Sequence, residues 1–241
     1  MRRNMTRLLA AILMAGTLSG LLVPLAFAEV ADHVVIGEIY VDEQGAGSEW
    51  IELYNPGTIM INIENWVIDT KSDTDADITL PSGAQIPAHG FYFIGDQSGG
   101  SWNPDKGTWL SPDYTETMTL TDADGWVRLR SSSGGPIIDT VGWGTSTTYE
   151  TSPANGPSEG ESLQRKVDAS TNEDGAHGPA WDTNNNGSDF FTQTSPDPQN
   201  SSQALPPVPE LPAILLLSLG LVIAGGYVWF RGRSVMSYKP G

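Results

Sequence analysis

Short runs of alternating apolar and polar residues fill the middle of the chain. The clearest is residues 48–56, where one face of an extended chain carries Ile51 and Leu53 and the other carries Trp50, Glu52 and Tyr54. The run contains branched and aromatic residues, which favour strands, and an Asn-Pro-Gly turn ends it. We predict a half-buried strand that needs a second sheet to cover Ile51 and Leu53.

Turn residues recur about every ten positions from here on, with short apolar runs between them. In residues 34–41 the alternation puts Val35 with Ile39 on one face and Ile36 with Glu38 on the other. Residues 116–121 and 125–130 are expected to form a hairpin. Further strands are predicted at residues 58–63, 65–69, 78–80, 91–94, 136–142 and 161–166. No segment between residues 29 and 209 keeps an apolar 3.6 period long enough for a helix, so we predict an all-β sandwich or barrel.

Both ends of the chain have targeting patterns. Residues 1–28 resemble a secretory signal peptide, with early arginines, an apolar run and a small-x-small site ending at Ala28; an uncleaved anchor helix is the alternative. Residues 211–230 are uncharged and, at about 1.5 Å per residue, span about 30 Å, the thickness of a bilayer core. The basic tail 231–241 follows, which predicts a transmembrane helix with its C-terminus in the cytoplasm. The domain is expected outside, at the outer face of the cell membrane or on the cell surface.

The charge is concentrated between these ends. The chain has 12 basic and 29 acidic residues, and six of the basic ones but none of the acidic ones lie in the terminal segments. Residues 29–210 therefore carry six basic and 29 acidic residues, a formal charge of −23. Such a segment repels nucleic acid and anionic lipid and attracts divalent cations and basic partners. It is also a solvated surface suited to a salty medium, where screening reduces self-repulsion. With no cysteine, disulfides and thiolate metal sites are excluded.

The order of several motifs resembles the lamin tail domain. The motifs are residues 35–39 (VIGEI), 47–56 (GSEWIELYNP), 78–83 (ITLPSG), 86–91 (IPAHGF), 139–144 (DTVGWG), 162–165 (SLQR) and 182–186 (DTNNN). They cover about residues 34–200, although Gly37 stands where the family usually has Asn. The resemblance implies an immunoglobulin-like β-sandwich over residues 29–200, with its core at about 34–192. It also implies a non-catalytic interaction module.

The C-terminal end has a second resemblance. Residues 208–212 (VPELP), the apolar stretch and the arginines after it are similar to an archaeal sorting signal of the Pro-Glu-Phe (PEF-CTERM) type, which an archaeosortase recognises and removes. Leu211 replaces the Phe of that motif, and a further tail follows, so an uncleaved single-span anchor is the alternative. Residues 201–210, rich in Pro and Ser, are expected to form a stalk.

The sequence offers little for catalysis. Residues 156–160 match G-x-S-x-G, but a nucleophile elbow needs a strand before it and a helix after it, and neither is predicted there. The three histidines are isolated and lack metal spacing. We expect no catalytic residues and no enzyme activity.

One loop has the spacing of a calcium site. Oxygen-bearing side chains alternate around a glycine at Asp182, Asn184, Asn186 and Asp189. The bidentate Glu of an EF-hand loop is missing, and Asn and Asp in such loops also bond to their own backbone without an ion. Calcium is the one cofactor that the sequence suggests.

Other candidate sites are a carboxylate pair, tryptophans and sequons. If their strands pair, Glu38 and Glu52 would be neighbours and would repel unless Arg128, Arg130, Arg165, a backbone donor or a cation intervenes. Exposed indoles stack on sugar rings, which makes Trp102, Trp109 and Trp143 candidates for glycan binding. Asn186 and Asn200 begin N-glycosylation sequons.

We therefore expect a cell-surface protein anchored by its C-terminal helix, with a role in adhesion or envelope structure. Its partner would be a cell-envelope protein or glycan. A calcium-dependent or carbohydrate-binding surface module is the alternative.

Overall fold

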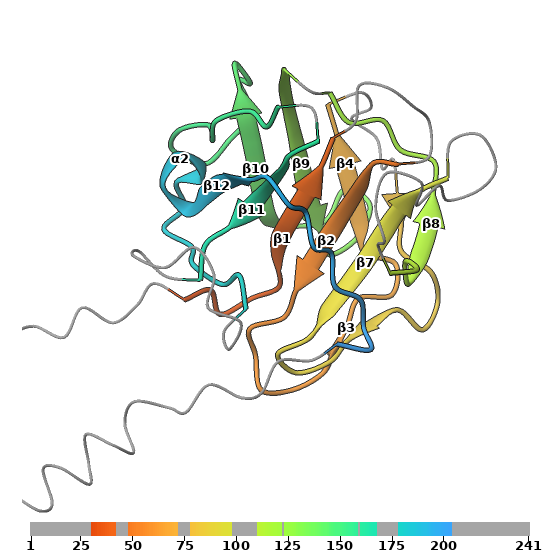
Figure 1. Cartoon of the computed structure of the whole chain (residues 1–241). Helices are drawn as coiled ribbons and strands as arrows, with labels where there is room; N and C mark the ends of the chain where they lie inside the picture. The colour runs from red at the N-terminus through yellow and green to blue at the C-terminus, as the bar shows by residue number, and fades with distance from the viewer. Residues whose placement is uncertain are drawn as a thin grey trace, which may run out of the picture.

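The protein folds as two facing β-sheets of six and four strands, with a small two-stranded sheet beside them (Figure 1). The structure is a computed structural model that describes residues 30–41, 48–71, 78–97, 110–121, 123–158, 160–167 and 178–203. The signal peptide, the transmembrane helix and the basic tail that the sequence predicts lie outside these residues. Within them, no helix is long and apolar enough to cross a membrane.

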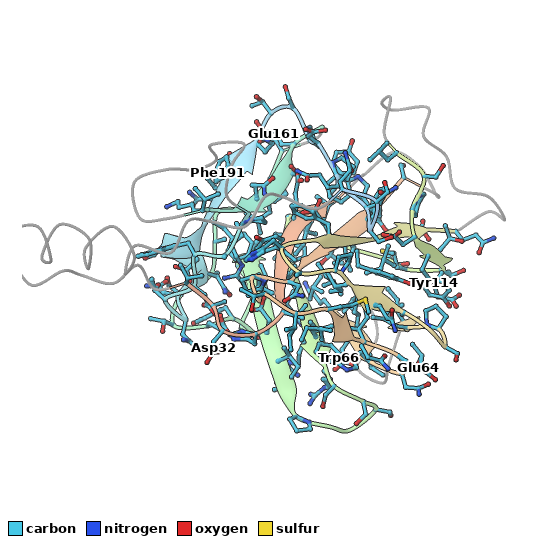
Figure 2. All side chains as sticks on the ribbon, turned by 90° about the horizontal axis from the view of Figure 1, so that it is seen from below. Asp32, Glu64, Trp66, Tyr114, Glu161 and Phe191 are labelled. Atoms are coloured by element: carbon cyan, nitrogen blue, oxygen red, sulfur yellow. The ribbon has the colours of Figure 1, made fainter. Side chains whose placement is uncertain are left out.

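The six-stranded sheet has the order β12-β11-β1-β2-β7-β8. Its strands are β12 (Phe190–Gln193), β11 (Ser162–Arg165), β1 (Val35–Tyr40), β2 (Trp50–Tyr54), β7 (Phe91–Asp96) and β8 (Tyr114–Glu116). All neighbours are antiparallel except β7 and β8, which are parallel. Phe191 on β12 and Tyr114 on β8 mark its two edges (Figure 2).

The four-stranded sheet has the order β10-β9-β4-β5. Its strands are β10 (Ile137–Gly144), β9 (Asp124–Arg130), β4 (Val67–Thr70) and β5 (Ile78–Thr79). The small sheet pairs β3 (Ile61–Asn62) with β6 (Gln85–Ile86), and the short helix α2 (Asn186–Asp189) precedes β12. The all-β fold class is confirmed.

The main core lies between the two large sheets. Ile39 and Ile51 from the six-stranded sheet pack in one cluster with Ile68, Val127 and Leu129 from the four-stranded sheet, and all five are fully buried. On β9 buried and partly exposed residues alternate strictly, as expected for a strand with one face inside. Burial of this apolar surface is the main source of the fold's stability.

A β-bulge in β1 reverses part of the predicted face pattern. The register between β1 and β2 shifts between Ile36 and Glu38, around Gly37. As a result Ile36 and Ile39 share the main core, while Val35 packs on the opposite face of the sheet. The prediction that Val35 lies with Ile39 is therefore wrong, because one extra residue moves the earlier side chains to the other face.

The predicted hairpin between residues 116–121 and 125–130 is also wrong. β8 lies at the edge of the six-stranded sheet, whereas β9 pairs with β4 and β10 in the other sheet. The connection crosses between the sheets, and the Leu120 N–H donates to the Glu49 carboxylate at 3.0 Å. The chain does change direction before β9, but it passes into the other sheet and does not return beside β8.

The outer face of the six-stranded sheet is covered as well. Every residue of β2 is buried, so the expectation of a half-buried strand is corrected. On this face Trp50 stacks on Tyr40 with ring centroids 5.7 Å apart and meets the edge of Phe93 at 5.5 Å. Residues 178–180 pack nearby, since a Cβ at Gly178 would overlap the Tyr54 ring.

The chain after β12 crosses this outer face in front of β1 and β2 (Figure 1). We call residues 194–203 the C-terminal strap. The Gln199 N–H donates to the Glu52 carboxylate at 2.6 Å, and the Ser201 N–H and hydroxyl donate to Asp113 at 2.9 and 2.5 Å. The strap is thus held to β2 and to the segment that leads into β8.

Candidate functional site

A buried ion pair joins the two large sheets. Arg165 on β11 donates from Nη2 to Oδ2 of Asp139 on β10 at 2.7 Å, and both side chains are completely buried. The guanidinium also donates to the Ile36 carbonyl at 2.9 Å and the Trp181 carbonyl at 3.0 Å, and it lies 4.6 Å from the Phe190 ring centroid. Arg165 therefore links four parts of the fold.

The ion pair also satisfies the backbone next to the bulge in β1. The Ile36 N–H donates to Asp139 Oδ2 at 2.7 Å, while the Ile36 carbonyl accepts from Arg165. β10 has its own register shift between Ile137 and Asp139. Since buried backbone groups need partners, the pair compensates the irregular pairing of β1. This is a structural role.

Glu150 lies in the electrostatic field of this cluster. Its pKa is raised to about 7, mainly by burial and then by the charges of Asp139 and Asp182, against the opposing effect of Arg165. Its carboxylate accepts from Asn186 Nδ2 at 3.2 Å. Glu150 thus gains a proton near neutral pH, and nothing in the sequence pattern marked it.

The side chains of the predicted calcium loop are engaged by the protein itself. Asn186 Oδ1 accepts the N–H groups of Gly142 and Glu150 at 2.9 and 3.0 Å, and its Nδ2 donates to the Thr140 carbonyl at 2.9 Å. Asp189 Oδ2 accepts the N–H groups of Thr183 and Asn185. These contacts fasten α2 to β10.

The remaining two residues of that loop follow the same pattern. Asp182 Oδ1 accepts the Asn184 N–H at 3.0 Å, and Asn184 has a positive φ of 54°, which Asn tolerates better than most residues. In the described part of the chain, no three or more His, Asp or Glu side chains group in a way that would hold a metal ion. Calcium binding stays a prediction.

A melting curve in calcium and then in chelator tests that prediction. Because the loop oxygens already accept hydrogen bonds from the protein, we expect the two melting temperatures to agree. An ion that binds only the folded state raises the melting temperature. A calcium-dependent rise of several degrees in the full-length protein would establish an ion site if it is lost in Asp182→Ala and kept in Glu64→Ala. The Glu64 carboxylate bonds to Ser82 and Gly83 and has no contact with the loop.

Glu38 and Glu52 face each other, as the sequence predicted. They are direct partners in the β1–β2 register, and both are buried. Burial raises the pKa of Glu52 well above its usual value, Glu38 and then Asp197 add to the rise, and the hydrogen bond from the Gln199 N–H opposes it. Ser162 Oγ donates to Glu38.

The arginines suggested for that pair have other contacts. Arg165 pairs with Asp139, and Arg130 Nε donates to Asp69 at 2.6 Å. The third, Arg128, stacks on Trp126. Of the partners that were suggested for Glu52, the structure supplies a backbone donor, the Gln199 N–H.

The predicted tryptophan and sequon residues differ in their exposure to solvent. Trp143 is fully buried and donates from Nε1 to the Thr121 carbonyl, so its indole is not exposed for stacking on a sugar, and that prediction is corrected. Trp102 and Trp109 lie outside the described residues. Asn186 is fully buried through its hydrogen bonds, so the folded domain does not present it for glycosylation. Asn200 is partly exposed on the strap, with Nδ2 donating to the Ser111 carbonyl at 3.1 Å.

The outer face of the four-stranded sheet carries an aromatic and basic cluster that the sequence analysis did not single out. Trp126, Arg128 and Arg130 alternate with buried residues on β9 and point outward. The Arg128 guanidinium lies 5.0 Å from the Trp126 ring centroid, and Lys71 at the end of β4 bonds to Asp124 at 2.7 Å. We call these four residues, Lys71, Trp126, Arg128 and Arg130, the basic face. The period-2 spacing of Trp126, Arg128 and Arg130 was the available signal in the sequence.

The electrostatics of the basic face are not fully compensated within the domain. Partial burial and then the neighbouring Arg130 lower the pKa of the Arg128 guanidinium, and the charge of Asp69, which pairs with Arg130, opposes them only in part. Arg128 Nε is buried and has no hydrogen-bond acceptor among the described residues. Of the six basic residues in the strongly acidic segment 29–210, three belong to this face.

The comparison with family models agrees with this architecture. Residues 28–145 match the family model described as Lamin Tail Domain. A solved structure of a DUF4876 family protein from Bacteroides thetaiotaomicron VPI-5482 is similar, with a TM-score of 0.49, 12% identity, and coverage of 73% of this chain and 74% of that chain. No curated protein matches. The match ends in the loop just after β10, and β11 and β12 complete the six-stranded sheet beyond it. Residues 28–145 thus carry the pattern of the lamin tail domain, a non-enzymatic, immunoglobulin-like family, within an all-β sandwich.

Proposed function

We propose that this protein is a non-catalytic surface module that acts in adhesion or envelope structure by binding a partner protein. Residues 1–28 direct its export, and residues 211–230 hold it at the outer face of the membrane as an anchor or sorting signal. The domain contributes a rigid sandwich, and the partner binds on its surface. The observation that carries the proposal is the basic face.

The basic face has the properties of a binding surface. It joins a partly exposed tryptophan to two arginines and a lysine on neighbouring strands. Tryptophan and arginine are the residue types that most often dominate the free energy of protein association. An acidic group of a partner would offset the mutual repulsion of Arg128 and Arg130 and would supply hydrogen-bond acceptors to the exposed guanidinium nitrogens. The expected partner is therefore an acidic envelope protein.

A carbohydrate is the second candidate ligand. Its support is the Trp126 indole, since partly exposed indoles provide stacking surfaces for sugar rings. A glycan that carries carboxylates would also match Arg128. Protease treatment of the envelope before binding separates the two candidates, because it removes a protein partner and leaves a polysaccharide in place.

We expect retention of the full-length protein on isolated cell envelopes to fall about fivefold or more in Trp126→Ala, since loss of a central aromatic contact costs more than about 1 kcal/mol. Arg128→Gln should weaken retention and reduce its sensitivity to salt. The charge-matched control is Lys166→Gln, whose Nζ donates to the Ser188 carbonyl away from this face.

Melting temperatures of the three variants serve to exclude unfolding as the cause. Equal retention of Trp126→Ala and the unchanged protein, at equal melting temperature, would contradict the role of the basic face. Retention that survives protease treatment would assign the ligand to the carbohydrate class.

A further inference from the structure

Two large apolar side chains project from a short turn after β2. Ile59 is 68% exposed and Met60 is 58% exposed, the largest exposed fractions among the apolar side chains in the described part of the chain. Single exposed apolar residues are ordinary on protein surfaces, but two adjacent ones on a braced turn are less so. We call residues 57–60 the apolar tip.

The exposure of the apolar tip is built into the fold. Asn55 is buried and donates from Nδ2 to the Ile59 carbonyl at 2.8 Å and to the Pro87 carbonyl at 2.9 Å. Asn55 Oδ1 accepts the Gly57 N–H at 2.9 Å. The turn is therefore fixed from inside the domain, and it holds Ile59 and Met60 in water.

Next to the apolar tip lies a shallow hollow of about 470 Å³. Its lining includes Met60, Pro81, Pro87, Tyr92, Asp113 and Ser201. Asp113 is the one charged lining residue, and its carboxylate accepts hydrogen bonds from the strap and from the Phe93 N–H at 2.9 Å. At the rim, the Glu64 carboxylate accepts from the N–H of the lining residue Gly83 at 3.2 Å. In a strongly acidic segment, this surface has little net charge.

The chain leaves the domain at the same place. Ser201 lines the hollow together with Met60, and Gln203, two residues later, is still fixed by its N–H bond to the Asn200 carbonyl at 2.9 Å. Seven residues, 204–210, then precede the uncharged stretch 211–230. Seven residues reach at most about 25 Å even when fully extended.

From this geometry we infer that the apolar tip is a membrane contact, with Ile59 and Met60 inserted into the bilayer surface next to the anchor. The inference rests on the proposed membrane anchoring. A second copy of the chain is a poorer occupant, because two segments of charge −23 repel each other. Large apolar residues at the boundary between headgroups and acyl chains are a common means of membrane contact.

The absence of cysteine in this chain makes a direct test possible. Ile59→Cys in the full-length protein accepts an environment-sensitive fluorophore, and Ile137→Cys gives a matched control, since Ile137 is 50% exposed on the edge strand β10. Each protein is reconstituted into zwitterionic phosphatidylcholine vesicles that contain lipids with quenchers near the headgroups. Flotation of the vesicles measures anchoring, and the loss of emission measures contact.

We expect both proteins to float with the vesicles and the label at residue 59 to lose about half or more of its emission, since interfacial apolar groups lie ~5–10 Å into the bilayer boundary. The label at residue 137 should keep its emission. Flotation without quenching at residue 59, or with equal quenching at both residues, overturns the contact and leaves the anchoring intact. Failure to float overturns the anchoring and the contact together. Emission at residue 59 that depends on protein concentration and not on quencher lipids overturns the contact in favour of self-association.

Discussion

Arg165→Met is expected to lower the free energy of unfolding by about 3–5 kcal/mol, the range for removing one partner of a buried ion pair. Asp139 would keep a buried carboxylate without its cation, and the carbonyls of Ile36 and Trp181 would each lose a donor. Methionine fills much of the same volume, so the loss would come mainly from the unpaired polar groups. For a domain of this size the melting temperature should fall by roughly 10 °C.

Two further variants identify the cause. Lys166→Met changes the next residue, whose side chain lies at the surface, and should shift the melting temperature by about 1 °C or less. Arg165→Met combined with Asp139→Leu should be less destabilised than the sum of the single changes, because the buried charge is then gone. Arg165→Met with unchanged stability would show that the ion pair contributes nothing to the fold.

Glu52→Gln is expected to stabilise the protein at pH 7.5. It removes one of two buried carboxylates that face each other, and the new amide oxygen still accepts the Gln199 N–H. A gain of about 1 kcal/mol corresponds to roughly 2–4 °C in melting temperature for a domain of this size. The expected gain is a direct consequence of the raised pKa of Glu52.

The effect should depend on pH in a defined direction. The pKa of Glu52 is higher in the folded protein than in the unfolded chain, so the folded state binds more protons and stability falls as pH rises above the unfolded value of about 4.3. The raised pKa of Glu150 causes a further decrease in stability with rising pH, and this decrease is complete at about pH 7. At pH 4.5 Glu52 is largely protonated in the folded protein, and the advantage of Glu52→Gln should shrink.

Thermal melting followed by tryptophan fluorescence at the two pH values measures this difference. The control Glu64→Gln is partly exposed, and its amide oxygen can still accept the Gly83 N–H, so it should change the melting temperature by about 1 °C or less at either pH. Glu38→Gln should act like Glu52→Gln, and the double change should gain less than the sum, because either single change removes the repulsion. A gain of equal size at pH 4.5 and 7.5 would contradict the assignment to a titrating carboxylate.

Local patterns in the sequence predicted the fold class and one pairing correctly. Alternation, turn residues and the lack of a helical period led to an all-β sandwich, and parity along β2 placed Ile51 and Leu53 inside. The facing of Glu38 and Glu52 followed from antiparallel pairing of two strands close in sequence. These features depend on neighbours in the chain, and a single sequence contains that information.

Features that depend on distant segments were missed. Nothing local marks the bulge at Gly37. The adjacent Ile36 backbone is paired by the side chains of Asp139 on β10 and Arg165 on β11, more than 100 residues later. The cover over the outer face of β2 comes from residues 178–180 and from the strap, so the strand that was predicted to be half-buried is buried throughout. The alternating Asn and Asp side chains of residues 182–189 suggested a calcium site, but the Asn186 side chain forms hydrogen bonds with the backbone of β10.

The C-terminal strap also determines how the domain would respond to tension. Force transmitted from the proposed C-terminal anchor would reach the Ser201 contacts to Asp113 first. The Asn200 contact to Ser111 and the Gln199 contact to Glu52 would follow, and strand β12 would come only after them. Detachment of the ten strap residues would release about 34 Å of chain before any strand is pulled from the sheet. The strap would thus act as an extensible tether that spares the sandwich under small loads.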